Sequence, residues 1–315
     1  MSQPTEVTVF APASIGNVAV GYDVLGCAVE GIGDRVTVRR LDAPTIRIDA
    51  ISGVAPDLPT APAENTATAA LQDLQEGRSL SVGFEVSIEK GIPLSAGMGG
   101  SAASAVGAVV AAAQVLPHDL TPADLLPHAL AGEAVSSGSA HPDNVVPCLY
   151  GGLALTHTVD PPEVVSLPVP TGLQCVLVRP DYTVETREAR AALPTTVPLA
   201  TATQQMAHLG TFVAGCYRDD CALIGRALRD TLAEPHRTAL VPGAEAVQRA
   251  AREAGALGCS FSGAGPTLFA WCDAPATAAA VREAMTTAFA EHNLDTESWI
   301  TGVAAEEASV VSPSA

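Results

Sequence analysis

The sequence predicts an α+β protein of two domains, and three observations lead to this. Stretches with strand periodicity and stretches with helical character follow one another without the regular β-α-β alternation of a parallel sheet. A proline-rich stretch at residues 160–170 interrupts them and is typical of a domain boundary. A chain of 315 residues is long enough for two hydrophobic cores. We therefore expect domains over residues 1–165 and 166–315.

In the first half, valine and isoleucine alternate with polar residues over short stretches, as in half-buried strands. Alanine-rich stretches favour helices. The expected elements are strands near residues 7–9, 36–38 and 46–48, a helix at 66–75, a strand at 84–88, helices at 101–116 and 126–134, and a strand at 151–156. Pro127 then falls in the first turn of its helix, where proline is tolerated.

The second half repeats this mixture of strands and helices. The expected elements are a strand at 173–178, helices at 201–216, 220–231 and 242–256, a strand at 267–271, a helix at 277–292 and a strand at 299–303. Gly258 is placed to end the helix at 242–256, because glycine readily adopts the backbone conformation that follows a helix. We expect residues 306–315 to form a loose tail.

Composition and charge exclude several classes of protein. Hydrophobic residues make up 48% and charged residues 16% of the chain, which is typical of a globular protein. A net charge of −18 disfavours nucleic acid and anionic membranes as partners. The apolar run at 102–113 is too short to cross a bilayer, and the first residues do not resemble a signal peptide. Seven cysteines without a C-x-x-C pair indicate reduced thiols, so we expect a cytoplasmic protein.

A glycine-rich stretch at residues 93–104 (P-L-S-A-G-M-G-G-S-A-A-S) carries the first functional signal. A predicted strand precedes it and a predicted helix follows it. This arrangement binds phosphate, because unpaired backbone N–H groups and the helix dipole attract an anion. The signature of a P-loop is absent, since the only lysine of the chain, Lys90, lies before the glycines. Taken alone, the stretch predicts phosphate binding and an ordinary tight turn about equally.

Two further motifs accompany this stretch, at residues 11–26 (A-P-A-S-I-G-N-V-A-V-G-Y-D-V-L-G) and 258–267 (G-C-S-F-S-G-A-G-P-T). Together the three resemble the motifs of the GHMP small-molecule kinases, in the family's order and over nearly the whole chain. The resemblance implies a two-domain GHMP kinase fold. Its N-terminal half is like ribosomal protein S5 domain 2, and its C-terminal half is a ferredoxin-like α/β domain.

Two features resemble the homoserine kinase branch of this family in particular. One is Asn17 with G-Y-D at residues 21–23, and the other is Glu133 followed by H-P-D-N-V-V-P at residues 141–147. This branch phosphorylates the side-chain hydroxyl of homoserine with ATP, on the way to threonine. The resemblance therefore implies a transferase that makes O-phosphohomoserine.

For the nucleotide, the resemblance implies that the second motif wraps the triphosphate of ATP. The residues that map onto this loop are Pro93, Leu94, Ser95, Ala96, Gly97, Met98, Gly99, Gly100, Ser101, Ala102 and Ala103. Gly100 replaces one serine of the family's usual G-L-G-S-S-A-A, which removes a side-chain donor and keeps the backbone. Asn65 lies where family members contact adenine, and it is nearly as well placed to cap the helix that follows.

The resemblance also implies a magnesium site. Ser101 and Glu133 would supply its oxygen ligands, which suit Mg²⁺. Without the resemblance, Glu133 reads as a solvated residue on a helix face.

For the acceptor, the resemblance implies groups that complement an amino acid. Arg190 and Arg237 would hold its carboxylate, because a planar guanidinium can donate two parallel hydrogen bonds to it. Asp23 would take the ammonium group, and Arg187 is expected to lie merely at the surface. The other residues expected to contact the substrate are Asn17, His141, Asn144, Thr186 and Gly263.

Catalysis would depend on how the acceptor hydroxyl is positioned against the phosphate more than on a strong general base. This fits a loose transition state for phosphoryl transfer. Asn144 would orient the hydroxyl group, with Asp143 in a supporting role and Glu133 on the metal. Homoserine and ATP are the expected small-molecule partners, and a homodimer is compatible with this assignment.

Two alternatives stay open on the sequence. Another GHMP kinase, acting on a different alcohol, should lack the pair of Arg190 and Arg237. A non-catalytic binding protein on the same fold should have lost Ser101 or Glu133, and both are present.

Overall fold

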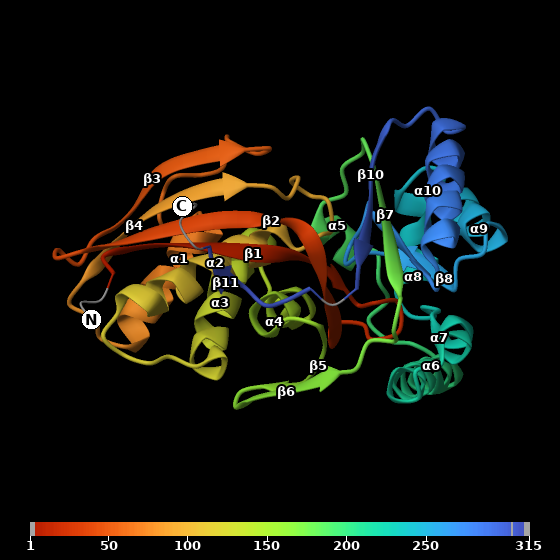
Figure 1. Cartoon of the computed structure of the whole chain (residues 1–315), viewed down its shortest axis with the longest axis horizontal. Coiled ribbons are helices and arrows are strands. Elements are labelled where there is room, and N and C mark those ends of the chain that lie inside the picture. Colours follow the sequence, from red (N-terminus) through yellow and green to blue (C-terminus); the bar gives the residue numbers. More distant parts are fainter. Residues whose placement is uncertain (1–3, 304, 312–315) are drawn as a thin grey trace.

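Two lobes lie side by side in the computed structural model, which describes residues 4–303 and 305–311 (Figure 1). The larger lobe comes mainly from the first half of the chain and the smaller lobe from the second. Each is built from a sheet and helices that pack on it, so the predicted α+β class is confirmed. No helix in the described part of the chain is both long and apolar enough to cross a membrane.

The larger lobe is a seven-stranded sheet with helices on one face (Figure 1). Its elements are β1 (Glu6–Gly16), β2 (Leu25–Leu41), β3 (Ile46–Gly53), α1 (Thr66–Gly77), β4 (Gly83–Lys90), α2 (Gly100–Val115), α3 (Pro122–Ser137), α4 (Pro142–Tyr150), β5 (Leu153–Val159), β6 (Pro162–Leu167) and β11 (Ser309–Val310). The strand order is β11-β1-β2-β4-β3, and β5 pairs with both β2 and β6. Only β3 and β4 run parallel within this described sheet.

The smaller lobe is a four-stranded antiparallel sheet with the order β10-β7-β9-β8. Its elements are β7 (Gln174–Pro180), α5 (Thr186–Ala191), α6 (Leu199–Tyr217), α7 (Cys221–Ala227), α8 (Glu234–Arg237), η1 (Thr238–Leu240), α9 (Ala244–Glu253), β8 (Gly258–Phe261), β9 (Leu268–Cys272), α10 (Pro275–Ala290) and β10 (Thr296–Gly302). Helices α9 and α10 contact each other and the sheet, and α6 and α7 form a separate pair (Figure 1).

Helix α3 begins earlier than predicted. Thr121 and Asp124 form a reciprocal capping box, which satisfies backbone N–H groups at the start of the helix. Pro127 therefore lies inside the helix and not in its first turn, so the predicted start at residue 126 was wrong. The helix that follows, α4, was missed, because its first turn contains Pro142 and it is only nine residues long.

Three boundaries in the second half also differ from the prediction. The proline-rich stretch at 160–170 contains β6, which completes the sheet of the larger lobe by pairing with β5. Helix α9 ends before Gly255, whose φ of +101° is suited to glycine, while Gly258 lies in β8. The predicted helix at 220–231 stops at Ala227.

The predicted loose tail is partly ordered. Val310 pairs with Val9 across β11 and β1, so the chain returns to the larger lobe after it completes the smaller one. Residues 312–315 of that tail lie outside the described residues. Both ends of the described chain therefore contribute a strand to the sheet of the larger lobe.

Helix α2 is the element that carries the glycine-rich stretch into the core. Nearly all its side chains are alanine, glycine or valine, and most are buried. It packs closely on β2: a Cβ atom placed on Gly107 would lie 2.7 Å from Cγ2 of Val36. Small side chains therefore bring the start of this helix down onto the sheet.

A buried ion pair fixes the first turn of α2. Lys90 and Asp34 are 3% and 0% exposed, and their charged groups are in contact. Lys90 Nζ also donates to the carbonyl oxygen of Gly100 at 2.7 Å and to Ser104 Oγ at 2.9 Å. Asp34 Oδ1 accepts from the N–H of Gly91 at 3.1 Å. This cluster joins β2, β4 and α2 directly beneath the glycine-rich loop.

We expect Lys90→Met to lower the free energy of unfolding by about 3–5 kcal/mol, because it leaves the Asp34 carboxylate buried without its partner. Urea denaturation followed by circular dichroism measures this loss. Glu89→Gln is the matched control: Glu89 pairs with Arg35 at the surface, where such pairs contribute about 0–1 kcal/mol. Equal, small losses for both variants would show that the buried pair does not stabilise the fold.

Candidate active site

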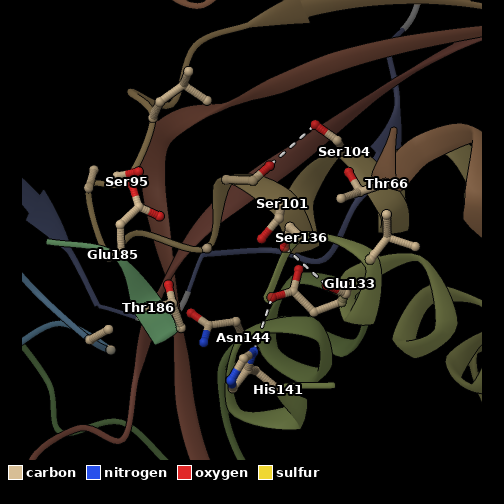
Figure 2. A pocket seen from close by; sticks show the side chains of 18 of the residues that line it. Thr66, Ser95, Ser101, Ser104, Glu133, Ser136, His141, Asn144, Glu185 and Thr186 are labelled. Atoms are coloured by element: carbon tan, nitrogen blue, oxygen red, sulfur yellow. Dashed lines mark hydrogen bonds and ion pairs between the residues drawn. The ribbon is translucent and has the colours of Figure 1, made fainter. Parts of the chain in front are cut away.

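A cavity of about 630 Å³ opens where the two lobes meet. All three sequence motifs contribute to its wall, together with α3, α4, α5 and α8. Figure 2 shows side chains from several of these elements gathered around it. The fold has therefore brought together segments that lie 246 residues apart in the sequence, as from Asn17 to Gly263.

Hydrogen bonds to backbone carbonyl groups hold the three motifs against one another. The N–H of Ser14 donates to the carbonyl of Met98 at 3.1 Å, which joins the first motif to the second. Ser262 Oγ donates to the carbonyl of Gly97 at 2.7 Å, which joins the third motif to the second. The N–H of Gly263 donates to the carbonyl of Gly16 at 3.1 Å and closes the ring. The third motif, which the sequence alone read equally well as an ordinary hairpin, is thus part of the cavity wall.

The glycines of the second motif are required by space and by backbone conformation. Gly97 and Gly99 have φ values of +72° and +67°, in the left-handed region that favours glycine. A Cβ on Gly97 would lie 2.5 Å from the carbonyl oxygen of Ser262, and one on Gly99 would overlap Ser14 Oγ. Gly99 also caps α2 without a side-chain acceptor. No side chain caps the first N–H groups of α2, and Gly99, Gly100 and Ser101 line the cavity, as in sites that bind phosphate.

Glu133 and His141 form a buried pair on the cavity wall. Glu133 is 4% exposed and its Oε1 lies 3.3 Å from Nδ1 of His141. Burial lowers the pKa of His141, but the hydrogen bond and the negative charge of Glu133 outweigh burial and raise that pKa above its ordinary value. Figure 2 shows Ser101, Glu133 and His141 pointing toward one another from α2, α3 and the start of α4.

The free oxygen of Glu133 fits a cation ligand. Glu133 Oε2 is buried and has no hydrogen-bond partner in the described chain, and an unpaired buried carboxylate oxygen is costly. Ser101 lines the same cavity. No cluster of three His, Cys, Asp or Glu side chains that could hold a metal exists among the described residues. One carboxylate and one hydroxyl suit Mg²⁺, which takes few protein ligands and completes its shell with phosphate and water.

Asp143 and Asn144 lie side by side at the start of α4. Asn144 Oδ1 accepts from Ser14 Oγ at 3.0 Å, and its Nδ2 donates to Asp143 Oδ1 at 3.3 Å. Asp143 is only 2% exposed. Burial, and next the negative charge of Asp23, raise the pKa of Asp143 to about 7. Asp143 is thus a carboxyl group that changes its protonation near neutral pH.

Arg190 and Asp23, which were expected to hold opposite ends of a substrate, bind each other. Arg190 Nη2 donates to both carboxylate oxygens of Asp23, at 2.9 and 3.0 Å. Arg237 is 5% exposed and donates from Nη1 to the carbonyl of Gly263 at 2.9 Å. The two arginines come from α5 and α8 and line one end of the cavity.

Asn17 joins the first and third motifs in the cavity wall. Its Nδ2 donates to the carbonyl of Gly263 at 3.1 Å, and its Oδ1 accepts from the N–H of Asp23 at 2.9 Å. Both polar atoms of the amide therefore hold the cavity wall together. Asn17 lines the cavity, and its contact with a substrate stays a prediction.

Asn65 caps helix α1, which is one of the two roles that the sequence left open. Its Oδ1 accepts from the N–H of Ala67 at 3.1 Å and so caps α1. Its Nδ2 donates to the carbonyl of Pro59 at 2.9 Å, which fixes the loop that forms the far end of the cavity. A contact of Asn65 with adenine stays a prediction.

The structure brings most of the predicted site residues to this one cavity. The exceptions are Met98, Ala102 and Ala103, whose side chains are buried in the core. Arg187, expected merely at the surface, is exposed but also lines the cavity. Lining residues that the sequence reasoning missed include Lys90, Ser104, Ser136 and Glu185. Ser136 had a signal, because it lies one helical turn after Glu133.

Comparisons with known proteins agree with this arrangement. The model of the GHMP kinases N terminal domain matches residues 65–152, and that of the GHMP kinases C terminal matches residues 212–291. A homoserine kinase of Xylella fastidiosa (strain M12) is 47% identical, over 93% of this chain and 90% of its own length. One of Chlorobium phaeobacteroides (strain BS1) is 41% identical, over 97% and 99%. The crystal structure of homoserine kinase from Cytophaga hutchinsonii superposes with a TM-score of 0.93 at 40% identity, covering 99% of both chains.

The raised pKa of Asp143 predicts a pH-dependent stability. Between pH 3.8 and about 7 the folded protein keeps a proton that the unfolded chain has lost, so the free energy of unfolding falls as pH rises through this window. Asp143→Asn has no proton to lose and keeps an acceptor for Asn144. We expect the variant to gain stability relative to wild type between pH 4.5 and 8, by at most about 4 kcal/mol.

Urea denaturation at both pH values measures this difference. Asp42→Asn, at an exposed position, controls for the loss of one negative charge. A gap between Asp143→Asn and wild type that stays constant with pH would contradict the raised pKa.

Proposed function

This chain belongs to the homoserine kinase family of the GHMP kinases, and we propose that it transfers the γ-phosphoryl group of ATP to the side-chain hydroxyl of L-homoserine. The product is O-phospho-L-homoserine, a precursor of threonine. One observation carries the proposal. A single cavity joins a phosphate-binding loop at the start of α2 to an arginine pair and an aspartate that complement an amino acid.

The glycine-rich loop and α2 would hold the triphosphate. The start of α2 lines the cavity without a side-chain cap, and the helix dipole favours negative charge there. The loop at Leu58 and Pro59, which Asn65 anchors, would hold the base at the other end. Because the buried ion pair of Lys90 and Asp34 fixes the first turn of α2, these N–H groups need no rearrangement when phosphate binds.

Ser101 and Glu133 would hold Mg²⁺ in this site. When bound, the cation neutralises charge on the phosphates. The lining residues supply too little positive charge for a polyanion, because the basic and the acidic ones nearly balance. The basic lining residues are Lys90, Arg187, Arg190 and Arg237, and the acidic ones are Asp23, Glu64, Glu133, Asp143 and Glu185. A divalent cation that arrives with the nucleotide supplies the missing charge.

Homoserine would bind at the arginine end of the cavity. Its carboxylate would meet Arg190 and Arg237, and its ammonium group would meet Asp23. Arg190 and Asp23 are already paired at 2.9 Å, so the group that would bind the carboxylate lies next to the group that would bind the ammonium. A zwitterion can join this pair without leaving a charge unpaired, whereas a neutral alcohol gains no such contacts.

The reacting hydroxyl would then lie beside Asn144 and Asp143, between the amino-acid end and the phosphate loop. Asn144 is held from both sides, by Ser14 and Asp143, so that its amide offers a fixed partner for the hydroxyl group. Phosphoryl transfer through a loose transition state needs this alignment more than early proton removal. Asp143 would act in support, because its carboxyl group accepts a proton readily near pH 7.

A cytoplasmic location and a homodimer belong to the same proposal. All seven cysteines are free in the structure, which agrees with a reducing compartment. Large apolar side chains that α6 exposes, Leu199, Met206 and Tyr217, offer a surface for a second copy. Light scattering of the purified protein measures the oligomeric state directly.

The activity itself is tested with a panel of acceptors. With Mg-ATP, we expect the kcat/KM for L-homoserine to exceed that for mevalonate, galactose or shikimate by at least about 10²-fold, since only homoserine satisfies both charges of the Arg190–Asp23 pair. A coupled assay for ADP release gives the rates, and mass spectrometry identifies O-phosphohomoserine. A higher kcat/KM for an acceptor that is not an amino acid would contradict the proposal.

The metal ligands are tested by Ser101→Ala and Glu133→Gln. Each removes an oxygen that would hold the cation on the phosphates, so kcat should fall by about 10²-fold or more, with the fold unchanged. High magnesium should partly rescue Ser101→Ala, because phosphate and water supply the remaining ligands. Glu283→Gln, exposed on α10, is the control. Wild-type turnover of Glu133→Gln at limiting magnesium would remove Glu133 from the metal site.

A further inference from the structure

Tyr22 lies beside both substrate arginines, and the reaction described above gives it no role. The guanidinium carbon of Arg190 is 5.9 Å from the centre of the Tyr22 ring, and that of Arg237 is 5.7 Å away. Tyr22 belongs to the turn between β1 and β2, in the larger lobe, whereas the arginines come from α5 and α8. A single ring thus contacts two cations that the other lobe supplies.

The two arginines need such a contact, because their charges oppose each other. Burial lowers the pKa of Arg237 most, and the positive charge of Arg190 contributes in the same direction. Both effects disfavour the charged form of the Arg237 guanidinium. The face of an aromatic ring carries partial negative charge and attracts a guanidinium within about 6 Å. The Tyr22 ring therefore offsets part of the repulsion between the arginines.

Arg237 depends on this contact more than Arg190 does. Arg190 has a carboxylate partner in Asp23. Among the described residues Arg237 has no ion pair, and it donates only to the carbonyl oxygens of Ala189 and Gly263, at 3.4 and 2.9 Å. Those bonds fix Nε and Nη1 and leave Nη2 for a ligand. The Tyr22 ring lies beside the same guanidinium, and the negative charges of Asp230 and Asp23 also favour its charged form.

We propose that Tyr22 is a positioning residue for the substrate carboxylate: its ring holds the guanidinium groups of Arg190 and Arg237 together so that both serve one carboxylate. The inference rests on the proposed homoserine kinase activity and deepens it. The role belongs to the ring and not to the hydroxyl group. Burial, and next the negative charge of Asp23, raise the pKa of Tyr22, so the phenol stays neutral and adds no charge to the site.

The test compares Tyr22→Leu, which removes the ring, with Tyr22→Phe, which keeps it. Tyr22→Leu should raise the KM for homoserine by about 2- to 30-fold, which is the range of cation–π strengths at tenfold per 1.36 kcal/mol. The KM for ATP should not change, because the nucleotide binds at the other end of the cavity. Tyr22→Phe should restore most of the affinity for homoserine. Tyr182→Leu, at an exposed position outside the cavity lining, is the control for loss of a tyrosine.

A second substrate separates positioning from general damage to the site. L-homoserine amide keeps the ammonium and hydroxyl groups but has no carboxylate, so Tyr22→Leu should leave its KM within about twofold of wild type. In an Arg237→Leu background, Tyr22→Leu should add little to the loss for homoserine, because the two side chains act on the same contact.

The outcomes distinguish the inference from the activity on which it rests. A wild-type protein that neither binds homoserine in calorimetry nor phosphorylates it overturns both. If wild type is active, an unchanged homoserine KM in Tyr22→Leu overturns the role of Tyr22 alone. So does an equal rise of KM for homoserine and its amide, which would mean that the ring supports the site in general.

Discussion

The buried ion pair between Lys90 and Asp34 connects the sheet of the larger lobe to the part of the molecule that would bind phosphate. Asp34 lies on β2 and Lys90 at the end of β4, and the ammonium group reaches the carbonyl of Gly100 and the hydroxyl of Ser104 in the first turn of α2. A charge buried this deeply needs its partner, since each group alone would be expensive to remove from water. The pair therefore ties the position of the phosphate loop to the strands that carry it.

The second constraint is the close approach of three loops from distant parts of the chain. Gly97 is touched by the third motif, and the carbonyl of Gly263 is shared by Asn17 and Arg237. Because the third motif belongs to the smaller lobe, these contacts also set how the lobes meet. The substrate arginine Arg237 is thus anchored to the same loop that supports the nucleotide site, which couples the two ends of the cavity.

Basic and acidic residues are nearly equal in number in the cavity of this acidic protein. The net charge is −18, yet the cavity holds four basic and five acidic lining residues, and the strongest contacts join opposite signs. Arg190 pairs with Asp23, and the ring of Tyr22 lies beside both arginines. A substrate with one positive and one negative group fits such a site without creating an unpaired charge. A polyanion fits it through backbone N–H groups and a divalent cation.

The α+β class and the order of most strands and helices were predictable from the sequence, because hydrophobic periodicity is local. Most of the predicted site residues line the cavity, and these followed from the resemblance to the GHMP kinases. The errors of the sequence-based prediction lie at the ends of elements, where a capping residue or a distant strand partner sets the boundary. Pro127 lies inside α3 because the capping box at Thr121 starts the helix earlier, and Val310 is ordered because it pairs with Val9. Only the tertiary structure shows that Arg190 binds Asp23 and that Asn17 supports the wall, since these contacts join residues that no local pattern relates.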